Sequence, residues 1–119
     1  MGKKPIETAP PINRAEALER IGGDPDFLNE LLGIYSEEFV LRFKELRAAL
    51  SGKGFKRIQE LGHSLKGSSA NLSLPALQQA AMDIEMAGRE EDIQKAKNSL
   101  AELEKEFERL KEYLAHPTA

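Results

Sequence analysis

The residue in this sequence best suited to chemistry is His63, within the segment 59–72. If this segment is helical, its apolar and small positions form one stripe, made by Phe55, Ile58, Leu61, Gly62, Leu65, Ser69 and Leu72. His63 falls on the other side of the helix, so we expect its imidazole to point into solvent. One and two turns away on the same face are Lys56, Gln59, Lys66, Gly67 and Ala70. The pattern predicts an exposed imidazole among small residues, with a cation on either side.

A neutral imidazole nitrogen is a competent nucleophile near pH 7, because the pKa of an unperturbed histidine is about 6.5. An exposed ring is suited to accept a phosphoryl group from another macromolecule. Lys66 would meet the phosphoryl oxygens as a point charge, and Lys56 would assist from the other side. Gly67 has no side chain to block a partner, although a helical glycine costs roughly 1 kcal/mol relative to alanine. No carboxylate cluster is present to hold Mg²⁺, so we infer that the partner supplies the metal.

The same residues also allow a structural interpretation. A lone exposed histidine on a helix is commonly an ordinary surface residue, and a helical glycine commonly marks close helix packing. A bundle that only docks a partner through this surface is therefore a second hypothesis. The nearby serines lack the G-x-S-x-G turn or the triad of a hydrolase. His63 and His116 lack the spacing of a zinc site, so we expect no bound metal and no cofactor.

The composition indicates one small helical domain. The chain has 119 residues, of which 31% are charged and 6% aromatic, and few are β-branched. The absence of cysteine favours a reducing, cytoplasmic setting. No apolar run approaches the ~20 residues that a membrane span requires, so we expect no membrane insertion. The net charge of −3 argues against nucleic acid as the main partner.

Apolar residues recur at helical spacing in several segments separated by glycine, proline and polar turns. The expected fold is all-α, an antiparallel up-down-up-down four-helix bundle with a short additional N-terminal helix acting as a lid. We expect that short helix to dock on the second one near Phe27, Leu31 and Ile34. The expected helices are 13–21, 25–50, 55–72, 74–88 and 93–114. The expected domain division is a tail or linker over 1–12, the bundle over 13–115 and a second tail over 116–119.

Several helix ends have recognisable signals. Asn13 followed by Glu16 resembles a capping box, and Asp24 before Pro25 supplies an N-cap. Ser73 is a candidate N-cap for the helix that follows it, and Gly88 is expected to end that helix. The glutamates of the last helix are expected to form a solvated face; these are Glu102, Glu104, Glu106 and Glu108.

The segment 63–72, His-Ser-Leu-Lys-Gly-Ser-Ser-Ala-Asn-Leu, resembles the H-x-L-K-G-S-x-x-x-L signature of histidine-containing phosphotransfer (HPt) domains. The similarity extends from about Ile12 along nearly the whole chain. It implies a four-helix bundle in which His63 carries the phosphoryl group, Lys66 steadies it and Gly67 makes room for the partner. The usual partner is a response-regulator receiver domain, which holds Mg²⁺ beside its phospho-aspartate. Some members place a glutamine on the next helix to bond the histidine, and here that position is Glu85.

The resulting hypothesis is a phosphorelay intermediate, in which His63 takes a phosphoryl group from one receiver aspartate and passes it to another. No nucleotide-binding loop is present, so we expect a phosphoryl carrier, monomeric and unable to phosphorylate itself from ATP. Two alternatives remain open: a docking module without phosphotransfer, and the phosphoacceptor domain of a larger hybrid or chemotaxis-type histidine kinase. Lys56, Gln59, Gly67 and Ala70 are the expected docking residues, and Glu85 would support the histidine from behind.

Overall fold

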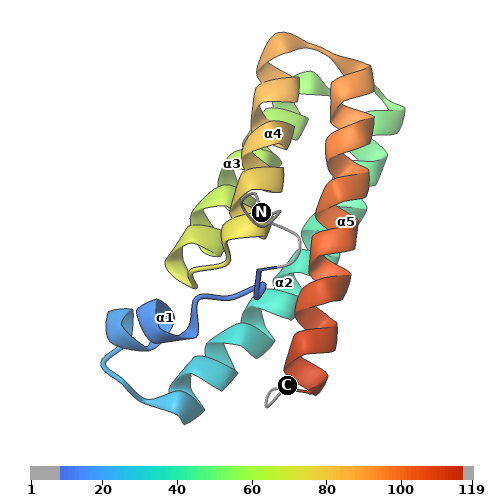
Figure 1. The fold of residues 1–119 in the computed structure, drawn as a ribbon. Coiled ribbons are helices and arrows are strands. Elements are labelled where there is room, and N and C mark those ends of the chain that lie inside the picture. Colours follow the sequence, from blue (N-terminus) through green and yellow to red (C-terminus); the bar gives the residue numbers. More distant parts are fainter. Residues whose placement is uncertain (1–8, 117–119) are drawn as a thin grey trace, which may run out of the picture.

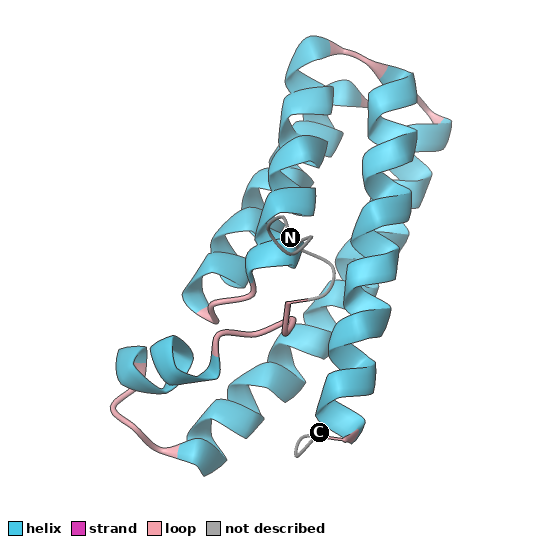
Figure 2. Cartoon of the chain, viewed as in Figure 1, coloured by secondary structure: helices cyan, strands magenta, loops and turns pink. Residues whose placement is uncertain are grey.

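The fold is all-helical over the residues that the computed structural model describes, 9–116. Five helices follow one another in this part of the chain and no strand is present in it (Figures 1 and 2). Their bounds are Arg14–Arg20 for α1, Pro25–Ser51 for α2, Phe55–Asn71 for α3, Pro75–Glu90 for α4 and Ile93–Ala115 for α5. The expected helices are therefore confirmed, with ends that differ by at most two residues.

Helices α2 to α5 form an antiparallel bundle, because each short turn reverses the chain direction (Figure 1). Helix α3 packs on α4 and α2, and α5 packs on α4 and α2. Helix α1 lies across one end of the bundle, near the start of α2 and the end of α3 (Figure 1). The predicted up-down-up-down arrangement with a short extra helix is confirmed.

The core consists of the apolar stripes that the helical spacing predicts. On α2 the buried stripe includes Leu28, Leu32, Tyr35, Phe39 and Leu46. The Phe39 ring stacks on Phe107 of α5, with ring centroids 3.9 Å apart. Burial of these side chains against one another is the main force that holds amphipathic helices together.

Helix α1 leaves part of the predicted docking surface uncovered. Ile21 packs against the core and Ala17 is fully buried. Phe27 and Ile34 of α2 remain 43% and 52% exposed. Helix α1 thus contacts α2, as expected, without burying these two side chains.

Two of the three expected caps are confirmed. The Asn13 side chain accepts a hydrogen bond from the backbone N–H of Glu16 at 3.1 Å, and Asp24 caps α2 in the same way. Ser73 does not cap α4. It has a left-handed backbone with φ of 58°, and Leu74 occupies the cap position without a side-chain bond.

Two glycines let α3 and α4 approach more closely than side chains would allow. A Cβ on Gly62 would lie 2.5 Å from the backbone nitrogen of Glu85, and one on Gly88 would lie 2.5 Å from that of Gln59. A Cβ essentially never lies so close to a heavy atom of another residue that is not its chain neighbour. The expectation that Gly88 ends α4 is therefore wrong. Gly88 lies inside α4, where it contacts α3.

The chain before α1 packs onto the bundle. Ile12 is 3% exposed and belongs to the core, and the backbone N–H of Asn13 donates to the carbonyl of Ser73 at 2.9 Å. Arg109 of α5 donates to the Ala9 carbonyl. For residues 9–12 the expectation of a tail is thus corrected, whereas 1–8 and 117–119 lie outside the described residues.

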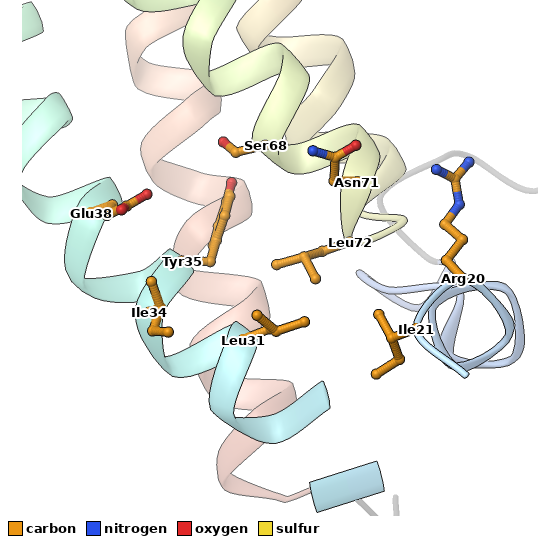
Figure 3. Close-up of a pocket in the computed structure, with 9 residues that line it drawn as sticks. All are labelled: Arg20, Ile21, Leu31, Ile34, Tyr35, Glu38, Ser68, Asn71 and Leu72. Atoms are coloured by element: carbon orange, nitrogen blue, oxygen red, sulfur yellow. The ribbon is translucent and has the colours of Figure 1, made fainter. Parts of the chain in front are cut away.

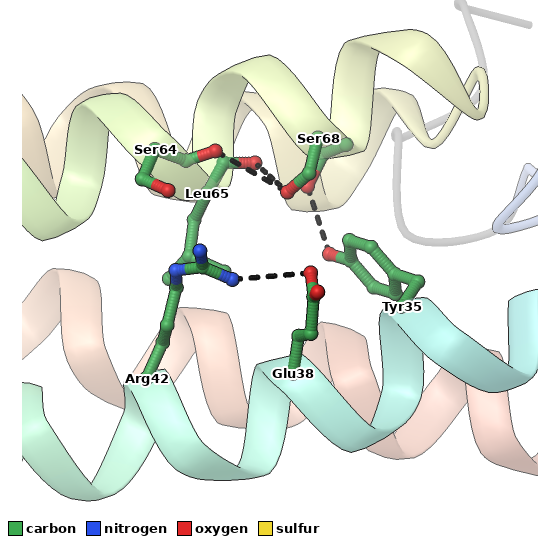
Figure 4. A network of polar contacts seen from close by, with 7 residues as sticks. Tyr35, Glu38, Arg42, Ser64, Leu65 and Ser68 are labelled. Atoms are coloured by element: carbon green, nitrogen blue, oxygen red, sulfur yellow. Dashed lines mark hydrogen bonds and ion pairs between the residues drawn. The ribbon is translucent and has the colours of Figure 1, made fainter. Parts of the chain in front are cut away.

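A polar seam joins α2 to α3 alongside the core (Figure 4). The Tyr35 hydroxyl and the Ser69 hydroxyl are 2.8 Å apart and buried, so neither lacks a partner. Burial raises the pKa of Tyr35 to about 12. On the exposed side of the same seam, Arg42 pairs with Glu38 at 3.3 Å.

One glutamate of α5 does not belong to the solvated face predicted for it. Glu106 is 2% exposed and accepts from Arg109 at 2.7 Å, so it lies inside the bundle with a cation beside it. Pairing with a cation is the usual way in which a buried carboxylate is tolerated.

Candidate functional site

His63 points out of the bundle from the middle of α3. Its side chain is 70% exposed, whereas Leu61 and Leu65 on either side of it in the sequence are in the core. The predicted orientation is therefore present, and it follows from the helical spacing of the buried stripe. A partner molecule has access to most of the ring.

Glu85 of α4 lies beneath the imidazole. One of its carboxylate oxygens, Oε2, is 3.0 Å from Nδ1 of His63, and the other, Oε1, is 2.7 Å from Nζ of Lys66. The Glu85 side chain is only 8% exposed. Its backbone lies against Gly62, the residue before the histidine, so the close approach of the two helices is what brings this carboxylate under the ring.

These contacts favour the ionised form of the Glu85 carboxylate and determine which nitrogen of the neutral His63 ring carries the proton. The hydrogen bond from Lys66 lowers the pKa of Glu85, burial opposes this effect, and the bond to His63 lowers the pKa further. An ionised carboxylate only accepts hydrogen bonds, so Nδ1 of a neutral ring carries the proton. The lone pair is then on Nε2, the nitrogen that does not contact Glu85.

A cleft between α3 and α4 opens beside the imidazole. It has a volume of about 710 Å³ and is lined by Phe55, Lys56, Gln59, Glu60, His63, Glu85, Gly88, Arg89 and Glu91. The structure thus brings Lys56 and Gln59 to the same cleft as His63, as predicted. Lys66 is held by Glu85 instead of extending freely into solvent.

Gly67 and Ala70 continue the exposed face of α3 beyond Lys66. Around Gly67, a Cβ would meet nothing within 4 Å apart from its own helix backbone, so no packing contact requires a glycine there. Ala70 is partly exposed. This stretch of α3 is low and open to an approaching surface, as the sequence predicted.

A second, mainly apolar hollow lies on the other side of α3, between α1 and α2 (Figure 3). Ile21, directly after α1, and Leu31 and Ile34 of α2 extend toward it. Ser68 and Asn71 border it on α3. Its volume is about 560 Å³. It does not include the histidine, so it is a candidate for docking and not for chemistry.

Within residues 9–116, no three His, Cys, Asp or Glu side chains come together in a way that would hold a metal ion. None of the described helices is both long and apolar enough to span a bilayer.

Comparison with known protein families identifies a match. The family model described as Hpt domain matches residues 30–113, well over half of the chain and including His63, Lys66 and Glu85. The chain belongs to the HPt domain family. No curated protein sequence matches it. The resemblance drawn from the motif is confirmed, and HPt domains act in phosphotransfer within two-component signalling and interact with receiver domains.

Sequence reasoning missed one residue of this HPt site, Arg89. It lies one turn after Glu85 on α4, and its guanidinium is 3.4 Å from Glu85 Oε2, the oxygen that also faces His63. The i, i+4 spacing of Glu85 and Arg89 is a signal that could have found it. The spacing alone would not have shown that both residues lie beneath the histidine.

Proposed function

We propose that this HPt domain is a phosphorelay intermediate in which His63 accepts a phosphoryl group from a receiver aspartate and passes it to another receiver. The observation that supports the proposal best is the pairing of an exposed imidazole with a buried carboxylate on its Nδ1. That pairing leaves Nε2 as an accessible nucleophile of defined tautomer. A histidine that served only as a surface residue would not need a carboxylate beneath it.

The proposed step balances without a proton leaving the ring. Nε2 attacks phosphorus, the N–P bond forms, and the bond between phosphorus and the aspartyl oxygen breaks to release the aspartate carboxylate. Nδ1 keeps its proton, so the ring becomes a cation, and Glu85 is placed to stabilise that charge. In the proposal Lys66, which already donates to Glu85, balances the carboxylate and meets phosphoryl oxygens with its other N–H groups.

The remaining requirements fall to the partner. In the proposal the receiver holds the Mg²⁺ that neutralises the transferring group, and this chain binds no metal or cofactor. The low surface at Gly67, Ala70, Gln59 and Lys56 receives the edge of the receiver's active site. We place the domain in the cytoplasm, where receiver domains and reducing conditions are found. We propose that it acts there as a monomer.

One experiment separates this function from its alternatives. The protein is mixed with a receiver domain phosphorylated on its aspartate, in the presence of Mg²⁺, and the label on the protein is tested for stability in alkali and lability in acid. Transfer to the wild type but not to His63→Gln supports the relay. Binding without transfer supports a docking module instead. Labelling from ATP alone would contradict the proposal that the chain is not an autonomous kinase.

A second arm tests whether the domain works as part of a larger histidine kinase. The isolated kinase core of such an enzyme would phosphorylate His63 directly with ATP, and a receiver would then remove the group. A relay intermediate exchanges the group with receivers in both directions. Transfer from the charged protein back to a receiver therefore belongs in the same assay.

A further inference from the structure

Two cations contact Glu85, and they are held very differently. Lys66 Nζ lies 2.7 Å from Oε1, the length of a charge-assisted hydrogen bond, and its side chain is 32% exposed. Arg89 Nη2 lies 3.4 Å from Oε2, beyond that range, and its side chain is 60% exposed. Arg89 is therefore the cation that can leave the carboxylate at little cost.

Arg89 is positioned to interact with a group bound to His63. It approaches the same carboxylate oxygen as His63 Nδ1, so guanidinium and imidazole share one acceptor and lie within two hydrogen-bond lengths of each other. Both also line the cleft between α3 and α4. When the ring becomes a cation, its Nδ1–H bond to Oε2 strengthens, and the guanidinium then competes for that oxygen with a charged donor.

We propose that Arg89 is a second phosphoryl-binding residue: it releases Glu85 when His63 is phosphorylated and donates to the phosphoryl oxygens on Nε2. This rests on the function proposed above. A guanidinium presents several N–H donors in one plane, a geometry that matches phosphoryl oxygens better than a lysine does.

The charges around the histidine agree with this assignment. Before transfer, Lys66 and Arg89 outweigh the carboxylate of Glu85 by one positive charge, with the ring neutral. The phosphoryl group adds two negative charges and the ring gains one positive charge, so the set becomes neutral. Without Arg89 it would carry a net negative charge. The other charged residues that line the cleft are Lys56, Glu60 and Glu91. Glu60 also lies 3.4 Å from Arg57, whose shorter ion pair is with Glu45.

The test measures an equilibrium, because an equilibrium constant between free species does not depend on how the two proteins dock. The protein and a receiver are mixed at equal concentrations with limiting phosphoryl group, and the division of label between aspartate and His63 is measured. Arg89→Gln is expected to shift this division toward the receiver roughly tenfold, about the effect of one charge-assisted hydrogen bond. Arg89→Lys keeps the charge but not the planar guanidinium. Its division of label is expected to lie between those of the wild type and Arg89→Gln. The matched control is Arg42→Gln, which removes another i, i+4 Arg–Glu pair, of 3.3 Å, from α2 and is expected to leave the division unchanged.

A second background distinguishes direct binding from an effect through Glu85. In Glu85→Gln the arginine has lost its anionic partner. If Arg89 acts only through that carboxylate, Arg89→Gln has no effect on the division of label in this background. The shift caused by Arg89→Gln is expected to persist in this background. If it vanishes, or if Arg89→Gln divides the label as the wild type does, Arg89 is not a phosphoryl ligand. If the wild type itself takes no label, the proposed function fails first.

Discussion

At the scale of single residues, the site combines an exposed nucleophile with a buried counter-charge. His63 is 70% exposed, whereas the carboxylate that holds its Nδ1 is 8% exposed. A hydrogen bond to a buried, ionised acceptor is stronger than one to a carboxylate in water. The exposed ring can therefore meet a partner protein without losing a fixed tautomer.

The state of Glu85 makes a prediction for stability against pH. Its pKa is lowered in the folded protein, chiefly by the hydrogen bond from Lys66, whereas an unfolded glutamate has a pKa of about 4.3. A lowered pKa gives stability that is present above the unfolded value and is lost as the pH falls through the folded value. We expect the wild type to be more stable than Glu85→Gln at pH 7, and the difference to shrink below about pH 4 as the carboxyl is protonated.

The measurement is urea unfolding followed by circular dichroism, for both proteins, between pH 7 and pH 2. A suitable control is Glu104→Gln, which changes a glutamate that is exposed on α5. A stability difference between the wild type and Glu85→Gln that stays constant over the whole range would show that the carboxylate charge contributes nothing to the fold.

At the scale of helices, three glycines that lie inside helices have different roles. Gly62 and Gly88 are buried between α3 and α4, where an added Cβ would meet backbone atoms of the other helix. Gly67 lies on the same helix as Gly62, and a Cβ there would meet nothing within 4 Å. The first two are needed for packing, which in turn positions Glu85. The third is free for a partner.

The glycines therefore separate stability from transfer. Gly62→Ala and Gly88→Ala are expected to destabilise the bundle by about 1–3 kcal/mol or more, because backbone cannot move aside as a flexible side chain does. Gly67→Ala is expected to be neutral or stabilising by up to about 1 kcal/mol, because alanine favours the helix. Gly67→Gln is expected to keep the fold and slow transfer from a receiver.

Urea unfolding and the transfer assay on the same variants check this contrast. Loss of stability in Gly67→Ala would show that this glycine is there for packing. Normal stability in Gly62→Ala would show that α3 and α4 can separate, and Glu85 would then need another explanation for its position under His63.

The same helices show how far the sequence alone could reach. Periodicity identified each helix and placed His63 on the outside, because a stripe of apolar residues depends only on local spacing. What it missed depends on contacts between helices. The sequence predicts that Gly88 ends a helix, although it is a packing contact. It also predicts that Glu106 is a surface residue, although Arg109 pairs with it inside the bundle.

The position of Glu85 and the burial of Ile12 also depend on contacts between segments that are distant in the sequence. The resemblance to HPt domains places Glu85 where other members carry a glutamine that bonds the histidine. The structure shows the contact itself and the close approach at Gly62 that allows it. Ile12 follows two prolines and reads as the end of a tail, yet it enters the core because the chain is held by Ser73. Such contacts join residues far apart in the sequence, and no single-segment pattern records them.

At the scale of the whole molecule, the exposed apolar residues of α2 lie unevenly around the helix. Ile34 is 52% exposed and borders the hollow that Ser68 of α3 also lines. Leu41 is 64% exposed and borders a second hollow, which Ser64 of α3 lines. Val40 is 54% exposed but lines neither hollow. Ser64 is next to His63 in the sequence, so a receiver large enough to cover the histidine and Gly67 would extend over Leu41 and Ile34. We infer that this side of α2 belongs to the surface that the receiver covers.

Val40 and Leu41 provide a matched pair for testing this, because they are adjacent, similarly exposed and turned about 100° apart on one helix. Leu41→Asp is expected to weaken receiver binding roughly tenfold, since it places a charge where apolar area would be buried. Val40→Asp is expected to leave binding within about twofold, because its side of α2 faces away from α3. Titration calorimetry with the unphosphorylated receiver measures both, and circular dichroism checks that each variant is folded. Equal losses in the two variants would mean that α2 responds to charge in general, and the docking surface would then be confined to α3 and α4.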